Sequence, residues 1–242
     1  MRAVLWGALA LLAASPAATV ASALDFDANR IEFSRTRIVL DAGRGSSTLT
    51  LVNRGRDTVL LNTAMLEART DGTADRDLCR LATVERPLKP LAAGDSEIVR
   101  VVLLDAPGEV ESLCFLRARF IPKASPDSDT RVTSVLAALV KVFMRPEALR
   151  DVDPIERARS DLKLEKTENG RMALRNATPF WLTLDSLEVA GKPVLAPDAR
   201  KPMLAPMTGR FEFDAPASSL VEARLLDDEG RPSTPLRWNT EQ

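Results

Sequence analysis

The stretch Val132-Thr-Ser-Val-Leu-Ala-Ala-Leu-Val-Lys-Val-Phe-Met144 decides the class of fold, because it is the longest apolar run beyond the N-terminal segment. Its apolar residues occupy both faces of any regular element, so no helical stripe separates a buried side from an exposed one. The β-branched and aromatic side chains of Val140, Val142 and Phe143 favour an extended chain. A strand that is apolar on both faces is typical of the inside of a sheet. We therefore expect a long, buried β-strand here.

The residues that precede this run also have the pattern of strands. Short β-type runs alternate with turn-rich pieces such as Asp41-Ala42-Gly43 and Asn53-Arg54-Gly55. The runs are Ile31–Phe33, Arg37–Leu40, Thr48–Leu51, Val59–Leu66, Glu97–Leu104 and Cys114–Ile121. Regular spacing of this kind predicts an antiparallel β-sandwich.

A charged segment with two prolines, Arg145 to Pro154, follows the run and suits a linker or hinge. Strand-like runs then resume at Leu162–Leu164, Met172–Leu174, Trp181–Val189, Arg210–Phe213, Val221–Leu226 and Leu236–Trp238. The sequence thus predicts an all-β protein with two sandwich domains joined by a hinge. We place the domains at residues 24–146 and 147–242.

The N-terminal segment, residues 1–23, has the features of a secretory signal peptide. Arg2 supplies a positive start, Ala3 to Leu12 is apolar, and Ala21-Ser22-Ala23 forms an A-x-A cleavage site. The alternative, a membrane anchor, needs a longer apolar stretch than this one. We expect cleavage after Ala23, export, and no insertion into a membrane.

The composition excludes several classes of function. Histidine is absent, which removes Ser-His-Asp and Cys-His catalysis and histidine-based zinc sites. With two cysteines, a four-thiolate zinc site cannot form, and no phosphate-binding or dinucleotide-binding glycine motif occurs. A net charge of −1 gives no electrostatic case for nucleic acid as a partner. We expect no enzymatic activity, no metal and no cofactor.

Four stretches together resemble the PapD-type pilus chaperones of the chaperone–usher pathway. They are Ser34–Asp41, Glu111–Leu113 with Ile121-Pro122, Val140–Pro146, and Asn176–Thr183. The resemblance implies two immunoglobulin-like sandwiches set at an angle, in an L or boomerang shape, around a cleft. It also implies a periplasmic chaperone that binds, folds and caps pilus subunits by donor-strand complementation and delivers them to an outer-membrane usher. The short connection from Pro122 to Val132 resembles the short-loop branch of the family.

The resemblance also implies a site. Arg37 and Lys141 occupy the positions of two cations that hold the C-terminal carboxylate of the pilus subunit. The donated strand would present Val132, Ser134, Leu136, Ala138 and Val140, although Ser134 departs from the large apolar residues of the family. The other phase, Val135, Ala137 and Leu139, is apolar as well, so the phase stays open, because a shift of one residue exchanges the two faces.

Glu111, Arg145 and Asp227 stand where the family places an ion triad that joins the domains, and Asp228 adjoins the last of them. Two departures, Val110 and Arg117, bear on fine specificity.

An oxidising compartment favours a disulfide between Cys79 and Cys114, the two cysteines of the chain. A rival function from another class is a secreted two-domain adhesin or structural pilus component. Pilins, however, lack the pairing of Arg37 with Lys141.

Overall fold

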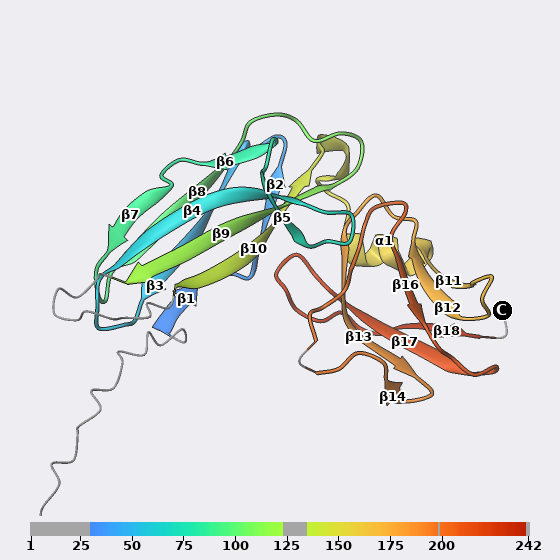
Figure 1. The fold of residues 1–242 in the computed structure, drawn as a ribbon. Helices are drawn as coiled ribbons and strands as arrows, with labels where there is room; N and C mark the ends of the chain where they lie inside the picture. The colour runs from blue at the N-terminus through green and yellow to red at the C-terminus, as the bar shows by residue number, and fades with distance from the viewer. Residues whose placement is uncertain (1–29, 123–134, 198, 241–242) are drawn as a thin grey trace, which may run out of the picture.

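The computed structural model describes residues 30–122, 135–197 and 199–240. The predicted all-β architecture is confirmed, and Figure 1 shows two β domains set at an angle to each other. No helix in the described part of the chain is long and apolar enough to cross a bilayer. The expected signal peptide, residues 1–23, lies outside the described residues.

The first domain is a sandwich of two sheets. One sheet has the order β1-β3-β8-β6, with β1 Ile31–Phe33, β3 Ser46–Asn53, β8 Ser96–Leu103 and β6 Ala82–Val84. The other has the order β2-β10-β9-β4-β5, with β7 also paired to β4. Its strands are β2 Arg37–Asp41, β10 Leu136–Arg145, β9 Ser112–Pro122, β4 Val59–Ala68, β5 Ala74–Leu78 and β7 Leu88–Leu91.

The two sheets enclose one hydrophobic core, to which both contribute. Leu49 and Val101 come from the first sheet, and Ile38, Phe120 and Val142 from the second. Full burial of such a side chain stabilises the fold by about 1.5–3 kcal/mol relative to exposure. The core therefore holds β2 and β10, which carry the predicted cations, in fixed positions.

The second domain has two smaller sheets. The three-stranded sheet has the order β11-β12-β16, with β11 Leu162–Lys166, β12 Met172–Asn176 and β16 Arg210–Phe213. The other has the order β14-β13-β17-β18, with β15 also paired to β13. Its strands are β14 Lys192–Pro193, β13 Leu182–Val189, β17 Leu220–Leu226, β18 Leu236–Asn239 and β15 Met203–Leu204.

The predicted linker contains ordered structure that the sequence analysis did not expect. A short 3-10 helix, η2 Glu147–Leu149, is followed by the α-helix α1 Pro154–Asp161. The Asp153 carboxylate caps α1 by accepting from the backbone N–H of Ile155 at 2.7 Å, and Pro154 occupies the first turn. Ile155 and Ala158 are buried in the second domain's core, which fixes the helix to that domain.

Strand β10 has different neighbours at its two ends. Its register with β9 is antiparallel from Leu136 to Met144, whereas its register with β2 is parallel and covers only Lys141 to Arg145. Within the described part of the chain, the stretch Leu136–Val140 therefore has a paired strand on one side only. Its backbone groups on the other side form an open sheet edge.

Candidate functional site

The predicted cations meet where the open edge begins. Arg37 is the first residue of β2 and pairs in register with Lys141 of β10. The parallel ladder thus brings together two residues that are far apart in the sequence. The structure places both where the domains approach each other, since Arg37 also contacts Asp227 of the second domain.

Arg37 is a buried cation that forms an ion pair with no carboxylate of the described residues. Its side chain is 5% exposed, its Nη1 donates to the backbone carbonyl of Asp227 at 2.9 Å, and its guanidinium lies 5.8 Å from the Phe143 ring centre. Its Nε is buried and has no hydrogen-bond partner among the described residues. Burial lowers the pKa of Arg37, although the acidic groups of Asp228, Asp227 and Glu111 oppose the shift. A buried charge in this state is costly unless an anion pairs with it.

Lys141 is the second unpaired cation. It is partly buried, and no carboxylate of the described residues lies within ion-pair distance of its Nζ. Burial, followed by the nearby charges of Arg37 and Arg200, lowers the pKa of Lys141 to about 8. An anion bound between Lys141 and Arg37 would relieve both the burial cost and the mutual repulsion.

The open edge presents two different faces. Val135 and Leu139 are 41% and 50% exposed, whereas Leu136 and Ala138 are half-buried, and Leu136 packs against the core. Val140 is 4% exposed and belongs to the first domain's own core. In this structure the Val140 side chain therefore packs inside the first domain, unlike the exposed side chains of Val135 and Leu139. The predicted donor residues Val132 and Ser134 lie outside the described residues.

A buried ion cluster joins the domains beside the cations. Arg145, at the end of β10, donates Nε and Nη2 to Glu111 at 3.0 and 2.8 Å and Nη1 to Asp228 at 2.9 Å. Glu111 also accepts from the backbone N–H of Trp181 at 2.9 Å, and the Arg145 guanidinium lies 5.0 Å from the Phe180 ring centre. Burial raises the pKa of Glu111 to about 7, against the opposing effect of Arg145.

The assignment of Asp227 to this cluster was wrong, and the partner of Arg145 is Asp228. The carboxylate of Asp227 accepts instead from the backbone N–H groups of Glu229 and Arg231 and from the Arg231 side chain. A carboxylate that folds back onto its own turn is common for aspartate in loops. Two adjacent aspartates cannot be told apart from the sequence when the turn decides which one faces outward.

Further contacts between the domains, most of them apolar, were not predicted. Leu66, Leu113, Phe115 and Phe143 of the first domain form a buried cluster with Met203 of the second, and Trp181 packs against it. Beside the cluster, Arg200 donates to the Gly72 carbonyl in the β4–β5 turn. The residues concerned come from distant segments, so no local pattern in the sequence marks them.

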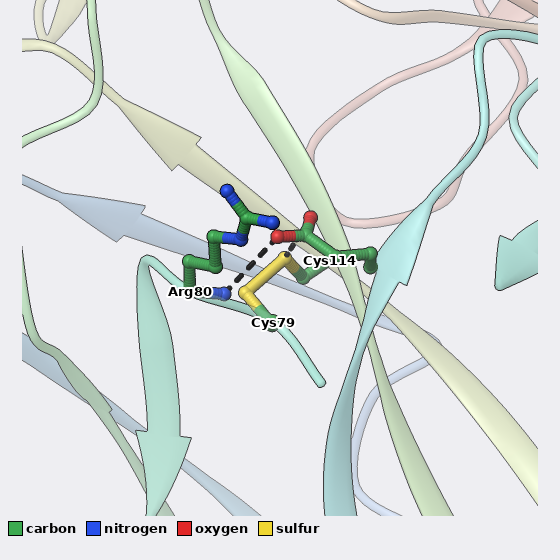
Figure 2. Close-up of a disulfide and its surroundings, with 4 residues drawn as sticks. Cys79, Arg80 and Cys114 are labelled. Carbon is green, nitrogen blue, oxygen red and sulfur yellow. Dashed lines mark hydrogen bonds between the residues drawn. A yellow bond between two sulfur atoms is a disulfide. The ribbon is translucent and has the colours of Figure 1, made fainter. Parts of the chain in front are cut away.

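Cys79 and Cys114 form a disulfide, with their Cα atoms 6.1 Å apart (Figure 2). It links the residue after β5 to the central strand β9. The carboxylate of Glu67 lies beside it, 3.6 Å from the Cys114 Sγ, and accepts from the Arg80 backbone N–H. Because the two sulfurs are bonded to each other, this group does not offer two thiolates to a metal ion.

The site therefore combines an open strand edge with two unpaired cations at its end. Backbone N–H and C=O groups on such an edge can bind another extended chain. Cations at the end of the edge favour an occupant that carries a negative charge at the corresponding position. The arrangement is suited to bind an extended segment that ends in an anion.

The family model and two curated relatives of this chain are all chaperones. The family model described as "Pili and flagellar-assembly chaperone, PapD N-terminal domain" matches residues 30–150. The Bordetella pertussis chaperone protein FimB/FhaD is 24% identical over 90% of this chain and 92% of its own length. The Escherichia coli chaperone protein PapD is 26% identical over 84% of each chain.

Solved structures share the fold. The E. coli chaperone DraB is 25% identical, with a TM-score of 0.71 and coverage of 86% of this chain and 96% of that chain. A chain of the Salmonella enterica complex of the SafA pilin with the SafB chaperone is 23% identical, with a TM-score of 0.72 and coverage of 86% and 95%. The similarity extends through both domains.

Proposed function

The chain belongs to the family of pili and flagellar-assembly chaperones typified by PapD, a class without enzymatic activity, and from this premise we propose how it acts. It binds pilus subunits in the periplasm, folds and caps them by donor-strand complementation, and delivers them to an outer-membrane usher. The single observation that carries the proposal is the open edge of β10, Leu136–Val140, which ends at the unpaired cations Arg37 and Lys141.

The geometry of the edge favours one direction for the bound strand. The open edge continues the line of β2, which runs parallel to β10 and begins at Arg37. A strand bound parallel to β10 would end at Arg37 and Lys141 and place its terminal carboxylate there. An antiparallel strand beginning there would bring a terminal ammonium group against two cations, and like charges at close range repel. The charges therefore select a parallel strand with its C-terminus at the cations.

The carboxylate would meet groups that are already largely desolvated. Charge-assisted hydrogen bonds from Arg and Lys to a carboxylate are stronger than neutral ones, and they strengthen where water is excluded. Removing one partner of a desolvated, hydrogen-bonded ion pair typically costs about 2–5 kcal/mol of binding free energy. We assign Arg37 and Lys141 as this anchor.

We propose that the donor residues, which fill the subunit's groove, belong to the set Val132, Ser134, Leu136, Ala138 and Val140. We also propose that the mature chain begins at Leu24, that the domains divide between residues 146 and 147, and that the protein belongs to the short-loop branch. The small number of residues between Pro122 and Val132 supports the last of these assignments.

Two substitutions test the anchor. The protein and the pilus subunit that copurifies with it from the periplasm would be coexpressed, with Arg37→Ala or Lys141→Ala in the chaperone. We expect soluble complex to be lost in both variants while the circular dichroism spectrum is retained. Arg44→Ala is the matched control, because Arg44 follows β2 and its side chain is 79% exposed. Undiminished complex in both test variants, or recovery of the protein as a component of assembled pili, would overturn the proposal.

A further inference from the structure

One turn of the second domain contacts both Arg37 and Arg145 of the first domain. It spans residues 227–231, between β17 and β18. The Asp228 carboxylate of this turn accepts from Arg145, and the Asp227 carbonyl accepts from Arg37 Nη1 at 2.9 Å. Asp228 thus contacts Arg145 through its side chain, and Asp227 contacts Arg37 through its backbone carbonyl.

The turn is fixed by its own hydrogen bonds. The Asp227 carboxylate accepts from the backbone N–H groups of Glu229 at 3.0 Å and Arg231 at 2.8 Å, and from Arg231 Nε at 2.9 Å. The Gly230 N–H donates to the Asp227 carbonyl at 3.0 Å, the same oxygen that holds Arg37. The acceptor that faces Arg37 therefore has a defined position before any ligand binds.

Gly230 is the residue of the turn that lies against Arg37. Its φ of +85° belongs to the left-handed region, which favours glycine. A Cβ atom at this position would lie 2.7 Å from the Thr36 Oγ1 and 3.5 Å from the Arg37 Nε. A side chain here would force the Thr36 hydroxyl to shift and would lie in van der Waals contact with the Arg37 guanidinium group.

We propose that the 227–231 turn, with Gly230 as its positioning residue, holds the Arg37 guanidinium in the orientation that binds the subunit's carboxylate. The anchor is then built from both domains, with the cation supplied by the first and its orientation by the second. The inference rests on the proposed function for the identity of the ligand. The positioning itself concerns the free protein.

The physical advantage is preorganisation. An arginine side chain has several rotatable bonds, and freezing them at the moment of binding reduces affinity. The Asp227 carbonyl occupies one N–H of Arg37 and leaves the Nε without a partner among the described residues. The guanidinium is thereby fixed without being neutralised, because a carbonyl accepts a hydrogen bond but carries no full charge.

The test compares two glycines that share a backbone conformation. Gly170, in the turn between β11 and β12, has a φ of +78°, and a Cβ atom there would meet nothing within 4 Å. Gly170→Ala therefore introduces the same backbone strain as Gly230→Ala but no contact with Arg37. Matching thermal unfolding of the two variants would show that strain is comparable.

The first measurement uses the protein without a subunit. In the wild type and in Gly170→Ala, the Arg37 Nε–H should give a discrete NMR resonance with slow hydrogen exchange. In Gly230→Ala it should shift and exchange at least tenfold faster. An unchanged Arg37 resonance in Gly230→Ala would overturn the positioning role.

The second measurement uses a synthetic peptide with the C-terminal sequence of the copurifying subunit, prepared as the free acid and as the C-terminal amide. We expect the wild type and Gly170→Ala to bind the acid at least tenfold more tightly than the amide. Gly230→Ala should lose most of this preference while still binding both peptides, whereas a general loss of structure would abolish the binding of both. If the wild type itself shows no preference, the proposed anchor fails, whereas a preference retained in Gly230→Ala contradicts only the role of the turn.

Discussion

The two halves of β10 differ in what surrounds them. From Lys141 to Met144 the strand is paired on both sides, and the residue that follows, Arg145, is buried with two carboxylates. Among the described residues, Leu136–Val140 is paired on one side only, and the arginine at the boundary, Arg37, is buried with no carboxylate partner. One strand thus carries a completed ion cluster at one end and an incomplete site at the other.

This difference separates a structural charge from a binding charge. Arg37 and Arg145 are the same residue type, are equally buried, lie near a phenylalanine ring and contact the same turn. Burial moves the pKa of Arg37 downward, whereas Asp228 and Glu111 outweigh burial and raise the pKa of Arg145. Burial alone therefore does not distinguish the two arginines, whereas the presence of neutralising carboxylates at Arg145 does.

The largest expected effect is on the free energy of unfolding, at the Arg145 end of β10. Glu111→Ala should lower the free energy of unfolding by about 3–5 kcal/mol, because it leaves Arg145 buried with only the half-exposed Asp228. Denaturant titration measures the loss. The matched control is Glu222→Ala, which removes the partner of Arg237 in an exposed pair and should cost at most about 1 kcal/mol. Equal losses of unfolding free energy in the two variants would contradict a special structural role for the buried ion cluster at Arg145.

At the open end, a charge should affect binding more than folding. Leu136→Asp places a carboxylate on the core-facing phase, where an apolar groove offers it no partner, and should weaken the subunit complex by about 1–3 kcal/mol. Leu139→Asp, on the exposed phase, should leave the complex intact. Coexpression with the subunit compares the two variants, with circular dichroism to verify folding. Loss of the complex in Leu139→Asp alone would assign donation to the other phase.

At the boundary, Lys141 should make binding depend on pH. Its pKa is lowered to about 8, so the cation required by a carboxylate is present below pH 8 and is lost as the pH rises. Affinity for the subunit should fall by up to about tenfold per pH unit above this value. Lys141→Arg should flatten the dependence, because a guanidinium stays charged. Affinity that is constant between pH 7 and 9.5 in the wild type would show that Lys141 does not contact the anion.

The same shift has the opposite sign for the stability of the subunit-free protein. Since Lys141 loses its proton near pH 8 when folded and near 10.5 when unfolded, the unfolded chain binds more protons between these values. The contribution of Lys141 to stability therefore rises with pH across this window. If affinity for the subunit falls while stability rises as the pH increases, Lys141 contributes to binding rather than to the stability of the free protein.

The sequence was most informative where the arrangement of apolar residues indicates a buried strand. The strand at Val132–Met144 was expected from its composition, and Leu136–Arg145 forms β10. Helix α1 was missed, although Asp153-Pro154 is an N-terminal cap signal, because the surrounding charges and prolines indicated a linker. The pairing of Arg37 with Lys141 came from family resemblance, since no local pattern links strands so distant in sequence.

Other features were hidden for a physical reason. The group that holds Arg37 is a backbone carbonyl, and carbonyls have the same chemistry at every residue, so the sequence does not mark them. Glycine at position 230 signals a turn but does not say what lies beside it. The choice of Asp228 over Asp227 likewise depends on how the turn is folded.

The start of β2 at Arg37 has a consequence for how a subunit is recognised. Because β2 occupies the sheet position directly beyond the open edge, an added strand meets another strand there and cannot continue. On the proposed function, the edge therefore limits how far a bound strand can extend, and the position of the strand's C-terminus decides whether it reaches the two cations. A subunit extended at its C-terminus would collide with β2, and one truncated by a few residues would leave the two cations empty. On the proposed function, a prematurely terminated subunit would therefore bind less tightly than a complete one.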